Sequence, residues 1–188
     1  MSLVPSAATD AAVITAIDTW LHRAVLGLNL CPFAHEPVRQ RRLHITVSPA
    51  RDADALLQDL ERELLDLRSS DPLLRETTLL VHPYVLRDFD AFANFLPVAD
   101  LSVRLLGLEG VLQLASFHPD YRFADTAADD VANATNRAPH PCLHLLREAS
   151  ISRAVANLTD PDAIYRRNIA TLQRLGWAGW HDLLARPR

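Results

Sequence analysis

The positions of apolar residues along the chain predict alternating helices and strands. Apolar side chains recur at helical spacing over residues 10–28, 52–68 and 88–106, and Pro97 is expected to break or kink the last of these helices. Short apolar runs that are typical of strands occupy residues 43–47, 77–81 and 111–117. Because strands alternate with long helices, the pattern favours right-handed crossovers and a mostly parallel sheet.

Beyond residue 120 the pattern is mainly helical. Thr126 and Asp129 are spaced as in a capping box, which predicts a short helix to about residue 135. Further helices are expected over residues 142–157 and from Asp160-Pro161 to Gly176, followed by an apolar segment that packs at the end. The predicted fold is a single α/β domain. Residues 10–120 form a small, mostly parallel sheet of three strands or slightly more, flanked by helices, and residues 121–188 are mainly helical and pack on it.

The composition narrows the possible chemistry. A net charge of −4 and 49% hydrophobic residues are typical of a globular protein that lacks a basic face for nucleic acid. No lysine occurs among the 19 basic residues, which excludes a pyridoxal phosphate Schiff base and a P-loop nucleotide site. No apolar run is long enough to cross a membrane, and the first residues do not resemble a signal peptide. We therefore expect a cytoplasmic protein with reduced thiols and with neither nucleic-acid nor membrane partners.

Two histidines each follow the end of a predicted strand. His82 and His118 both precede a proline, and Asp120 follows shortly after His118. Ligands of open parallel sheets bind beyond the carboxyl ends of the strands, so neighbouring strands would bring both imidazoles into one crevice. There the three side chains would act as a general acid and base oriented by the carboxylate, or would bind a divalent metal ion. The alternative is that each histidine only forms hydrogen bonds with the backbone at its strand end.

A second group of polar residues lies between residues 133 and 147. Amide, guanidinium and imidazole groups that suit a carboxylate or phosphate ligand are present at Asn133, Asn136, Arg137, His144 and Arg147. If residues 142–157 are helical, His144 and Arg147 share one face of that helix, and its amino-terminal end offers an anion site. The alternative is a surface network of ion pairs between the arginines and nearby acidic residues.

Three further residues are weaker candidates. Cys31 follows the expected end of the first helix, where the helix dipole raises the pKa of a thiol, so an inert cysteine is favoured unless a histidine reaches it. Tyr121 and Asp125 lie in the polar stretch after His118. Asp125 and the acids near it either bind magnesium or only cap a helix.

Several motifs resemble a known bacterial family. They are NLCPFA at residues 29–34, ETTLLVHP at 76–83, LEGVLQLASFHPDYRFADTAADDVANATNRAPHPCLHLLREASI at 108–151 and RNIATLQRLG at 167–176. Together they resemble domain-of-unknown-function family 1415 over roughly residues 16–176. The resemblance implies a cytoplasmic bacterial protein, and it supplies no reaction and no assigned site residue.

These observations lead to three functional hypotheses. The first is an enzyme acting on a small anionic metabolite by hydrolase- or lyase-type acid–base chemistry, with His82, His118 and Asp120 as the acid–base or metal site and the arginines and asparagines as the substrate clamp. The second is a non-catalytic module that binds an anion or a partner protein. The third is a redox or hydrolytic enzyme based on Cys31. The first is favoured because polar groups are concentrated beyond two strand ends.

Overall fold

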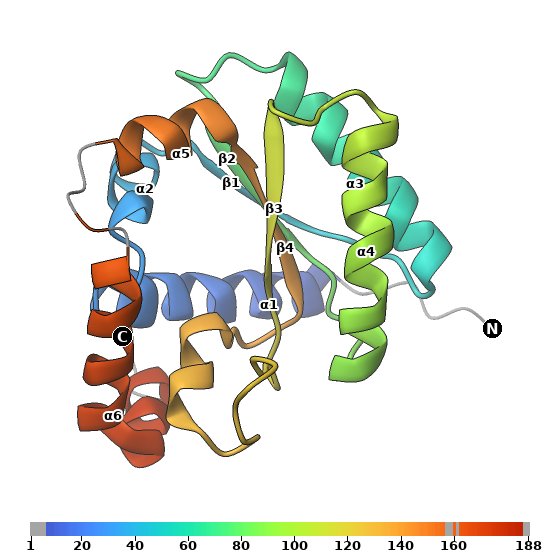
Figure 1. Ribbon diagram of the computed structural model, residues 1–188. Coiled ribbons are helices and arrows are strands. Elements are labelled where there is room, and N and C mark those ends of the chain that lie inside the picture. The colour runs from blue at the N-terminus through green and yellow to red at the C-terminus, as the bar shows by residue number, and fades with distance from the viewer. Residues whose placement is uncertain (1–6, 157–159, 161, 186–188) are drawn as a thin grey trace.

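A four-stranded sheet forms the centre of the protein, as seen in a computed structural model that describes residues 7–156, 160 and 162–185 (Figure 1). The strand order is β1-β2-β4-β3. β1 (Leu43–Val47) is parallel to β2 (Thr77–Val81), whereas β4 (Cys142–Arg147) is antiparallel to both β2 and β3 (Leu112–Phe117). Because β1, β2 and β3 run in the same direction, the predicted α/β class with a mostly parallel sheet is confirmed.

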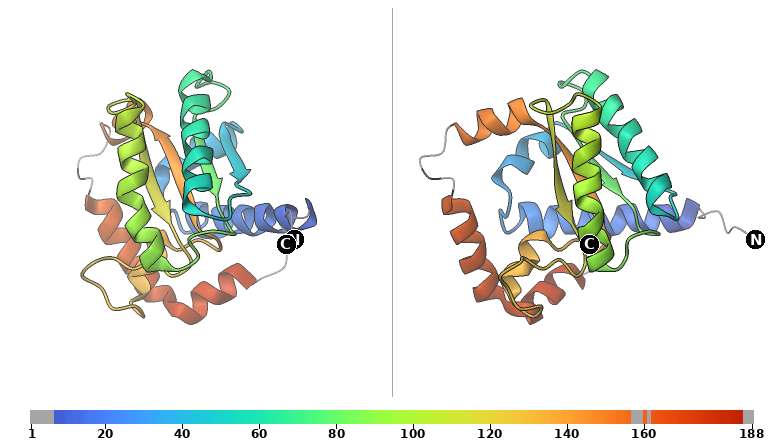
Figure 2. Two further views of the ribbon diagram at one scale, coloured as in Figure 1. Left: turned by 90° about the vertical axis from the view of Figure 1, so that its right-hand side faces the viewer. Right: turned by 45° about the vertical axis from the view of Figure 1, so that its right-hand side comes forward.

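Two helices cover one face of the sheet. α3 (Ala53–Ser69) connects β1 to β2 and α4 (Phe89–Leu105) connects β2 to β3, and both lie on the same side (Figure 2). Each begins at an aspartate, Asp52 or Asp88, whose carboxylate accepts a hydrogen bond from a backbone N–H of the first turn. α4 continues through Pro97, so Pro97 does not break the helix there. Leucines of α3 and Phe92 of α4 pack on the sheet as one buried cluster.

The other face carries the remaining helices. α1 (Ala7–Trp20) crosses it and continues as a π-helical segment, η1 (Leu21–Leu26). The 3-10 turn η2 (Pro32–Ala34) and the short helix α2 (His35–Arg39) follow. α5 (Glu148–Val155) and α6 (Asp162–Ala185) complete this side (Figure 1). Within the described residues, no helix is both long and apolar enough to span a membrane.

The predicted helix over residues 142–157 is wrong in its first half. Residues 142–147 form β4, and only then does the chain become helical, in α5; residue 157 lies outside the described residues. Leu143 and Leu145 are fully buried toward α3 and α4, whereas Cys142 packs in the cluster on the other face. A strand that is covered on both faces carries apolar residues on both, so its alternation of apolar and polar residues is weak. Its sequence then resembles that of a leucine-rich helix. Residues 121–188 therefore contribute a central strand to the core.

Two other local predictions concern helix ends. The short helix predicted from Thr126 is instead η3 (Val131–Asn136), which begins after Asp130 because the Asp130 carboxylate accepts from the N–H of Ala132. The Thr126 hydroxyl contacts Asn133. In the last helix, Gly176 has φ 64° and ψ 173°, which interrupts α6 where the sequence predicts an end. The predicted start at Asp160-Pro161 includes residue 161, which lies outside the described residues.

Candidate functional site

His82 and His118 belong to a closed aromatic cluster beside α4. β4 separates the two strands that they follow, so the expected direct neighbourhood of these strands is wrong. The ring of Phe92 nevertheless contacts both imidazoles, with centroid distances of 5.5 Å to His82 and 5.2 Å to His118. Both histidines have no exposed surface. The structure therefore brings the two histidines together through Phe92, inside the core and not in an open crevice.

Backbone groups occupy both ring nitrogens of His118. The Asp120 N–H donates to Nδ1 at 3.0 Å, so Nδ1 is an unprotonated acceptor and Nε2–H donates to Leu86 O at 3.3 Å. Leu86 has a left-handed φ of 52°, a conformation that bulky residues rarely adopt and that this hydrogen bond helps to hold. Burial lowers the pKa of His118 and keeps its ring neutral. This geometry fits the alternative in which the histidine orders the backbone.

His82 is held in a similar way. Its Nδ1 lies 3.1 Å from Val85 O and must donate to it. This leaves Nε2 as an unprotonated nitrogen that is sealed from solvent and has no hydrogen-bond partner among the described residues. Burial lowers the pKa of His82 to about 4. Among the described residues, no three histidine, cysteine or acidic side chains are placed to hold a metal ion. The geometry therefore gives no support to a metal site of His82, His118 and Asp120.

Asp120 and Arg137 lie at a small surface hollow of about 320 Å³, lined also by Asp88, Phe89, Asp90, Arg122 and Ala128. Arg137 donates to Tyr121 O at 3.2 Å and to Ala128 O at 2.8 Å, and its guanidinium lies 4.5 Å from the centre of the Trp177 ring. These contacts tie the loop after β3 to α6. With carboxylates on the same walls, the hollow is poorly suited to an anion.

The two asparagines hold the same loop in place. Asn133 is fully buried; its Oδ1 accepts from Phe123 N–H at 3.1 Å, and its Nδ2 donates to Ala127 O at 2.8 Å. Asn136 donates from Nδ2 to Ser116 O at 3.2 Å. Their amide groups are therefore used in shaping the loop that the sequence suggests as a ligand clamp.

Tyr121 and Asp125 also lie in this loop. The Tyr121 ring packs edge-on against Phe89, with centroids 5.3 Å apart, and so extends the aromatic cluster around His118. Asp125 is exposed at the surface. Neither residue is among those that line the surface hollow at Asp120.

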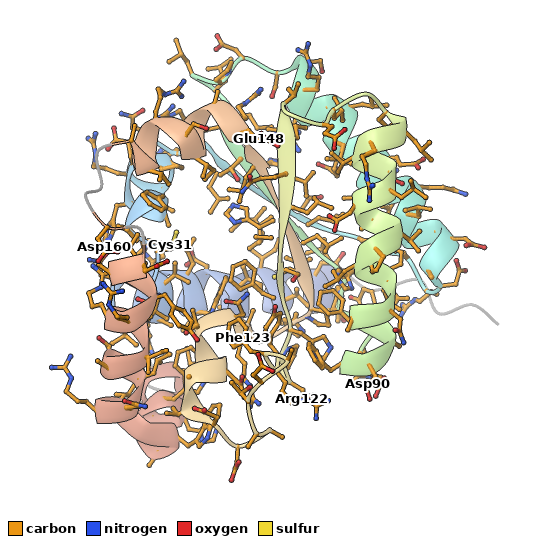
Figure 3. The ribbon with its side chains drawn as sticks, viewed as in Figure 1. Cys31, Asp90, Arg122, Phe123, Glu148 and Asp160 are labelled. Atoms are coloured by element: carbon orange, nitrogen blue, oxygen red, sulfur yellow. The ribbon has the colours of Figure 1, made fainter. Side chains whose placement is uncertain are left out.

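Arg147 lies at the opposite end of β4 from this loop. Its Nη2 donates to three backbone oxygens at and beyond the end of α3, those of Leu67 at 2.6 Å, Ser70 at 2.8 Å and Arg75 at 3.2 Å. The guanidinium therefore caps the carboxyl end of that helix. Figure 3 shows Glu148, the next residue, far from Arg122 in the loop after β3. This distance argues against Arg137 and Arg147 acting together on one small molecule.

A cavity of about 580 Å³ lies on the sheet face that carries α1. Its floor consists of residues that point to this face from the four strands, among them Thr77, Leu79, Ala115, Phe117, His144 and Leu146. Its walls come from η1, the segment from Cys31 through α2, and α5. Most of the lining is apolar, and one wall is π-helical, a distortion that is frequent at functional sites. We refer to this cavity as the sheet pocket.

Cys31 stands in the wall of the sheet pocket, near α2 and well separated from Asp90 and Arg122 (Figure 3). Cys31 follows the end of η1, as the sequence indicates, and it also directly precedes the three-residue η2. Burial raises the pKa of Cys31, and the N–H groups of Phe33 and Ala34, which face the sulfur, offset only part of that effect. The thiol is therefore protonated at neutral pH, but it shares its pocket with a histidine.

That histidine is His144, on the floor of the sheet pocket. Its Nε2 lies 2.7 Å from Oγ1 of Thr77, which itself lies 2.6 Å from Leu145 O. Burial lowers the pKa of His144 to about 4, so the imidazole is neutral at pH 7. Since residues 142–147 are a strand, His144 and Arg147 point to different surroundings and do not form the helical pair that the sequence suggests.

Charged groups at the edge of the sheet pocket are paired within the protein. Glu36 forms an ion pair with Arg39 at 2.7 Å, and Glu76 forms one with Arg42 at 2.5 Å. Arg147, the arginine among the described lining residues, is engaged with the end of α3. The pocket therefore presents thiol, imidazole and hydroxyl groups, and Nη2 of its described arginine is engaged with carbonyl oxygens, whereas the Nε of that arginine has no partner among the described residues.

The sequence did not point to Thr77, Ala115 or the apolar floor as parts of a site. Thr77 begins an apolar strand and is far in sequence from His144, and no spacing links the two. The alternation of Cys142, His144 and Leu146 with buried leucines is a signal for a strand, but a leucine-rich run is also typical of a helix.

Comparison with known proteins gives a family but no relative of known activity. Neither a curated protein nor a solved structure matches the chain. One family model, described as Protein of unknown function (DUF1415), matches residues 12–182. The matched residues include all four strands and the described residues that line the sheet pocket. The chain therefore belongs to the DUF1415 family.

Proposed function

We propose that the protein binds a small, largely apolar molecule in the sheet pocket. The observation that carries this proposal is a cavity of about 580 Å³ whose lining is mostly apolar, with Cys31 and His144 as polar groups inside it. Small-molecule sites are typically concave, span roughly 300–1,000 Å³ and combine apolar walls with a few polar groups that orient the ligand. The sheet pocket has each of these properties.

The geometry favours this function over the enzyme for a small anion that the sequence suggests. In that hypothesis, His82 and His118 exchange protons with a substrate, but both are buried and face backbone groups. The clamp would need Arg137 and Arg147 on one ligand, and each is engaged at a different end of the sheet. The sheet pocket instead supports a function that differs from the three expected from the sequence, because its mostly apolar lining suits an apolar ligand and not an anion.

A cysteine-based enzyme is the second candidate. It is supported by the position of Cys31 at the start of η2, with two backbone N–H groups facing its sulfur and His144 lining the same pocket. In such an enzyme the sulfur attacks an electrophilic carbon of the bound molecule while a nearby base accepts the thiol proton. Because the free thiol is protonated, this reaction depends on a substrate that brings sulfur and base into contact.

Filling the sheet pocket tests the proposed function. Ala115 lies on the pocket floor, so Ala115→Phe should occupy the space that a ligand needs. The matched control is Leu105→Phe, which adds the same ring at a position of α4 that is 77% exposed. Protein purified under native conditions would be extracted with organic solvent and the extract analysed by mass spectrometry. A small molecule present in the wild type and the control but lost from Ala115→Phe supports the proposal; identical extracts from all three contradict it.

A further inference from the structure

We propose that the sheet pocket selects an uncharged molecule whose hydroxyl or N–H group donates a hydrogen bond to Nδ1 of His144. This inference rests on the proposed function and specifies the chemistry of the ligand. It assigns His144 as the residue that determines specificity and Thr77 as the residue that positions it.

The hydrogen bonds around Thr77 determine which ring nitrogen of His144 carries the proton. A carbonyl oxygen can only accept, so the hydroxyl proton of Thr77 is directed to Leu145 O, 2.6 Å away. The contact of 2.7 Å between Thr77 Oγ1 and His144 Nε2 must then be an N–H donated by the ring. In the neutral imidazole, Nδ1 is consequently an unprotonated acceptor.

This Nδ1 is available to a ligand. Within the described part of the chain it has no hydrogen-bond partner, and it is not sealed in the interior, in contrast to the unpaired Nε2 of His82. His144 is part of the pocket floor, so a molecule in the pocket can reach it. A ligand that covers this acceptor without donating to it leaves a desolvated polar atom unpaired, which costs binding free energy. The pocket therefore distinguishes a donor from an acceptor of the same shape.

Charge also disfavours an ionised ligand beside this acceptor. A carboxylate placed against Nδ1 would set two acceptors against each other. The guanidinium of Arg147 is held by carbonyls at the end of α3, and the acidic side chains Glu36 and Glu76 stand at the pocket edge. An anion beside His144 would thus lose its hydration, and the cation of the described lining, Arg147, already donates from its Nη2 to carbonyl oxygens.

Three probes with one ring system separate these possibilities. They are 2-naphthol, which donates a hydrogen bond, 2-methoxynaphthalene, which only accepts one, and 2-naphthoate, which is charged. Binding at pH 7 would be measured by calorimetry and by the fluorescence of Trp20, which lines the pocket. We expect 2-naphthol to bind about five- to tenfold more tightly than 2-methoxynaphthalene, the effect of one hydrogen bond, and 2-naphthoate to bind most weakly.

Two variants assign this preference to His144 and Thr77. His144→Leu should bind 2-naphthol and 2-methoxynaphthalene equally. Thr77→Val removes the hydroxyl that holds the ring proton on Nε2, so either nitrogen can carry the proton, and the preference for 2-naphthol should fall at least about threefold. Circular dichroism and thermal unfolding would confirm that each variant is folded. Because Thr77→Val leaves the imidazole in place, it tests the assignment even if His144→Leu does not fold.

The outcomes separate the inference from the proposed function. If no probe binds the wild type, or if Ala115→Phe leaves binding unchanged, the sheet pocket is not the binding site and both proposals fail. If the probes bind in the pocket but 2-methoxynaphthalene equals 2-naphthol, or 2-naphthoate binds most tightly, only the inference about His144 is overturned. An unchanged preference in folded Thr77→Val would likewise contradict the role of Thr77.

Discussion

Acid should destabilise this protein through two histidines that folding buries in their neutral form. The pKa of His82 and of His144 is lowered to about 4 in the folded protein, against about 6.5 in an unfolded chain. Between these pH values the unfolded chain binds more protons than the folded protein. The contribution of these neutral histidines to the free energy of unfolding is therefore complete above pH 6.5 and is lost as the pH falls to 4. His82, which has no exposed surface, should cost about 3 kcal/mol between pH 7 and pH 4, and His144, which faces the sheet pocket, should cost less. Together the two losses would be a large part of the roughly 5–15 kcal/mol by which domains are stable.

The assay is urea unfolding at several pH values from 7 to 4, followed by circular dichroism and tryptophan fluorescence. His82→Asn keeps an N–H for Val85 O and cannot be protonated in this range. Its free energy of unfolding should therefore fall by about 3 kcal/mol less than that of the wild type over the same interval. His181→Asn, at an exposed position of α6, removes one histidine from the surface and serves as the control.

Two results would refute this reasoning about buried histidines. One is a pH dependence of His82→Asn that matches both the wild type and the His181→Asn control. The other is a direct titration by nuclear magnetic resonance in which the His82 ring of the folded protein is protonated near pH 6.5, since that would show no penalty for burying its charge.

Three further predictions address single residues. Arg147→Met should lower the free energy of unfolding by about 2–4 kcal/mol, because it leaves carbonyls at the end of α3 unpaired. Urea denaturation measures this free energy, and a change below about 0.5 kcal/mol would argue against the capping role. Gly27→Ala should lower the free energy of unfolding by about 1–3 kcal/mol and lower the melting temperature, because the added Cβ would collide with Arg23 O. An unchanged melting temperature would contradict this prediction. Cys31 should react slowly with iodoacetamide at pH 7 and faster as the pH rises, because burial raises the pKa of its thiol. Rapid labelling at pH 7 would instead indicate a thiolate and contradict this prediction.

The core of the fold could be predicted from sequence because its pattern is local. The helices α3 and α4 each have one buried apolar face, and their aspartate caps mark where they begin. The strand β4 could not be identified in the same way. Leu143 and Leu145 face one helical layer, whereas Cys142 and Leu146 face the other, so local hydrophobicity does not reveal the strand. Its position between β2 and β3 depends on pairing with distant segments.

The candidate site was harder to predict, because backbone contacts decide what each polar side chain does. His118 and Asn133 are candidate site residues in the sequence, yet in the structure their polar atoms form hydrogen bonds with backbone groups of nearby loops. Asn133 also contacts the Thr126 hydroxyl. The sheet pocket, in contrast, depends on contacts between strands. Thr77 meets His144 only because β2 pairs with β4, and Cys31 joins them only because η2 and α2 follow the first helix. No short motif contains these relationships.

A crystal structure of the protein with 2-naphthol would show directly whether the sheet pocket is the binding site. We expect the ring system between Phe117 and Leu146 on the pocket floor, with the hydroxyl within hydrogen-bond distance of Nδ1 of His144. Ligand found instead beside His82 and His118, or in the surface hollow at Asp120, would contradict the assignment of the sheet pocket as the functional site.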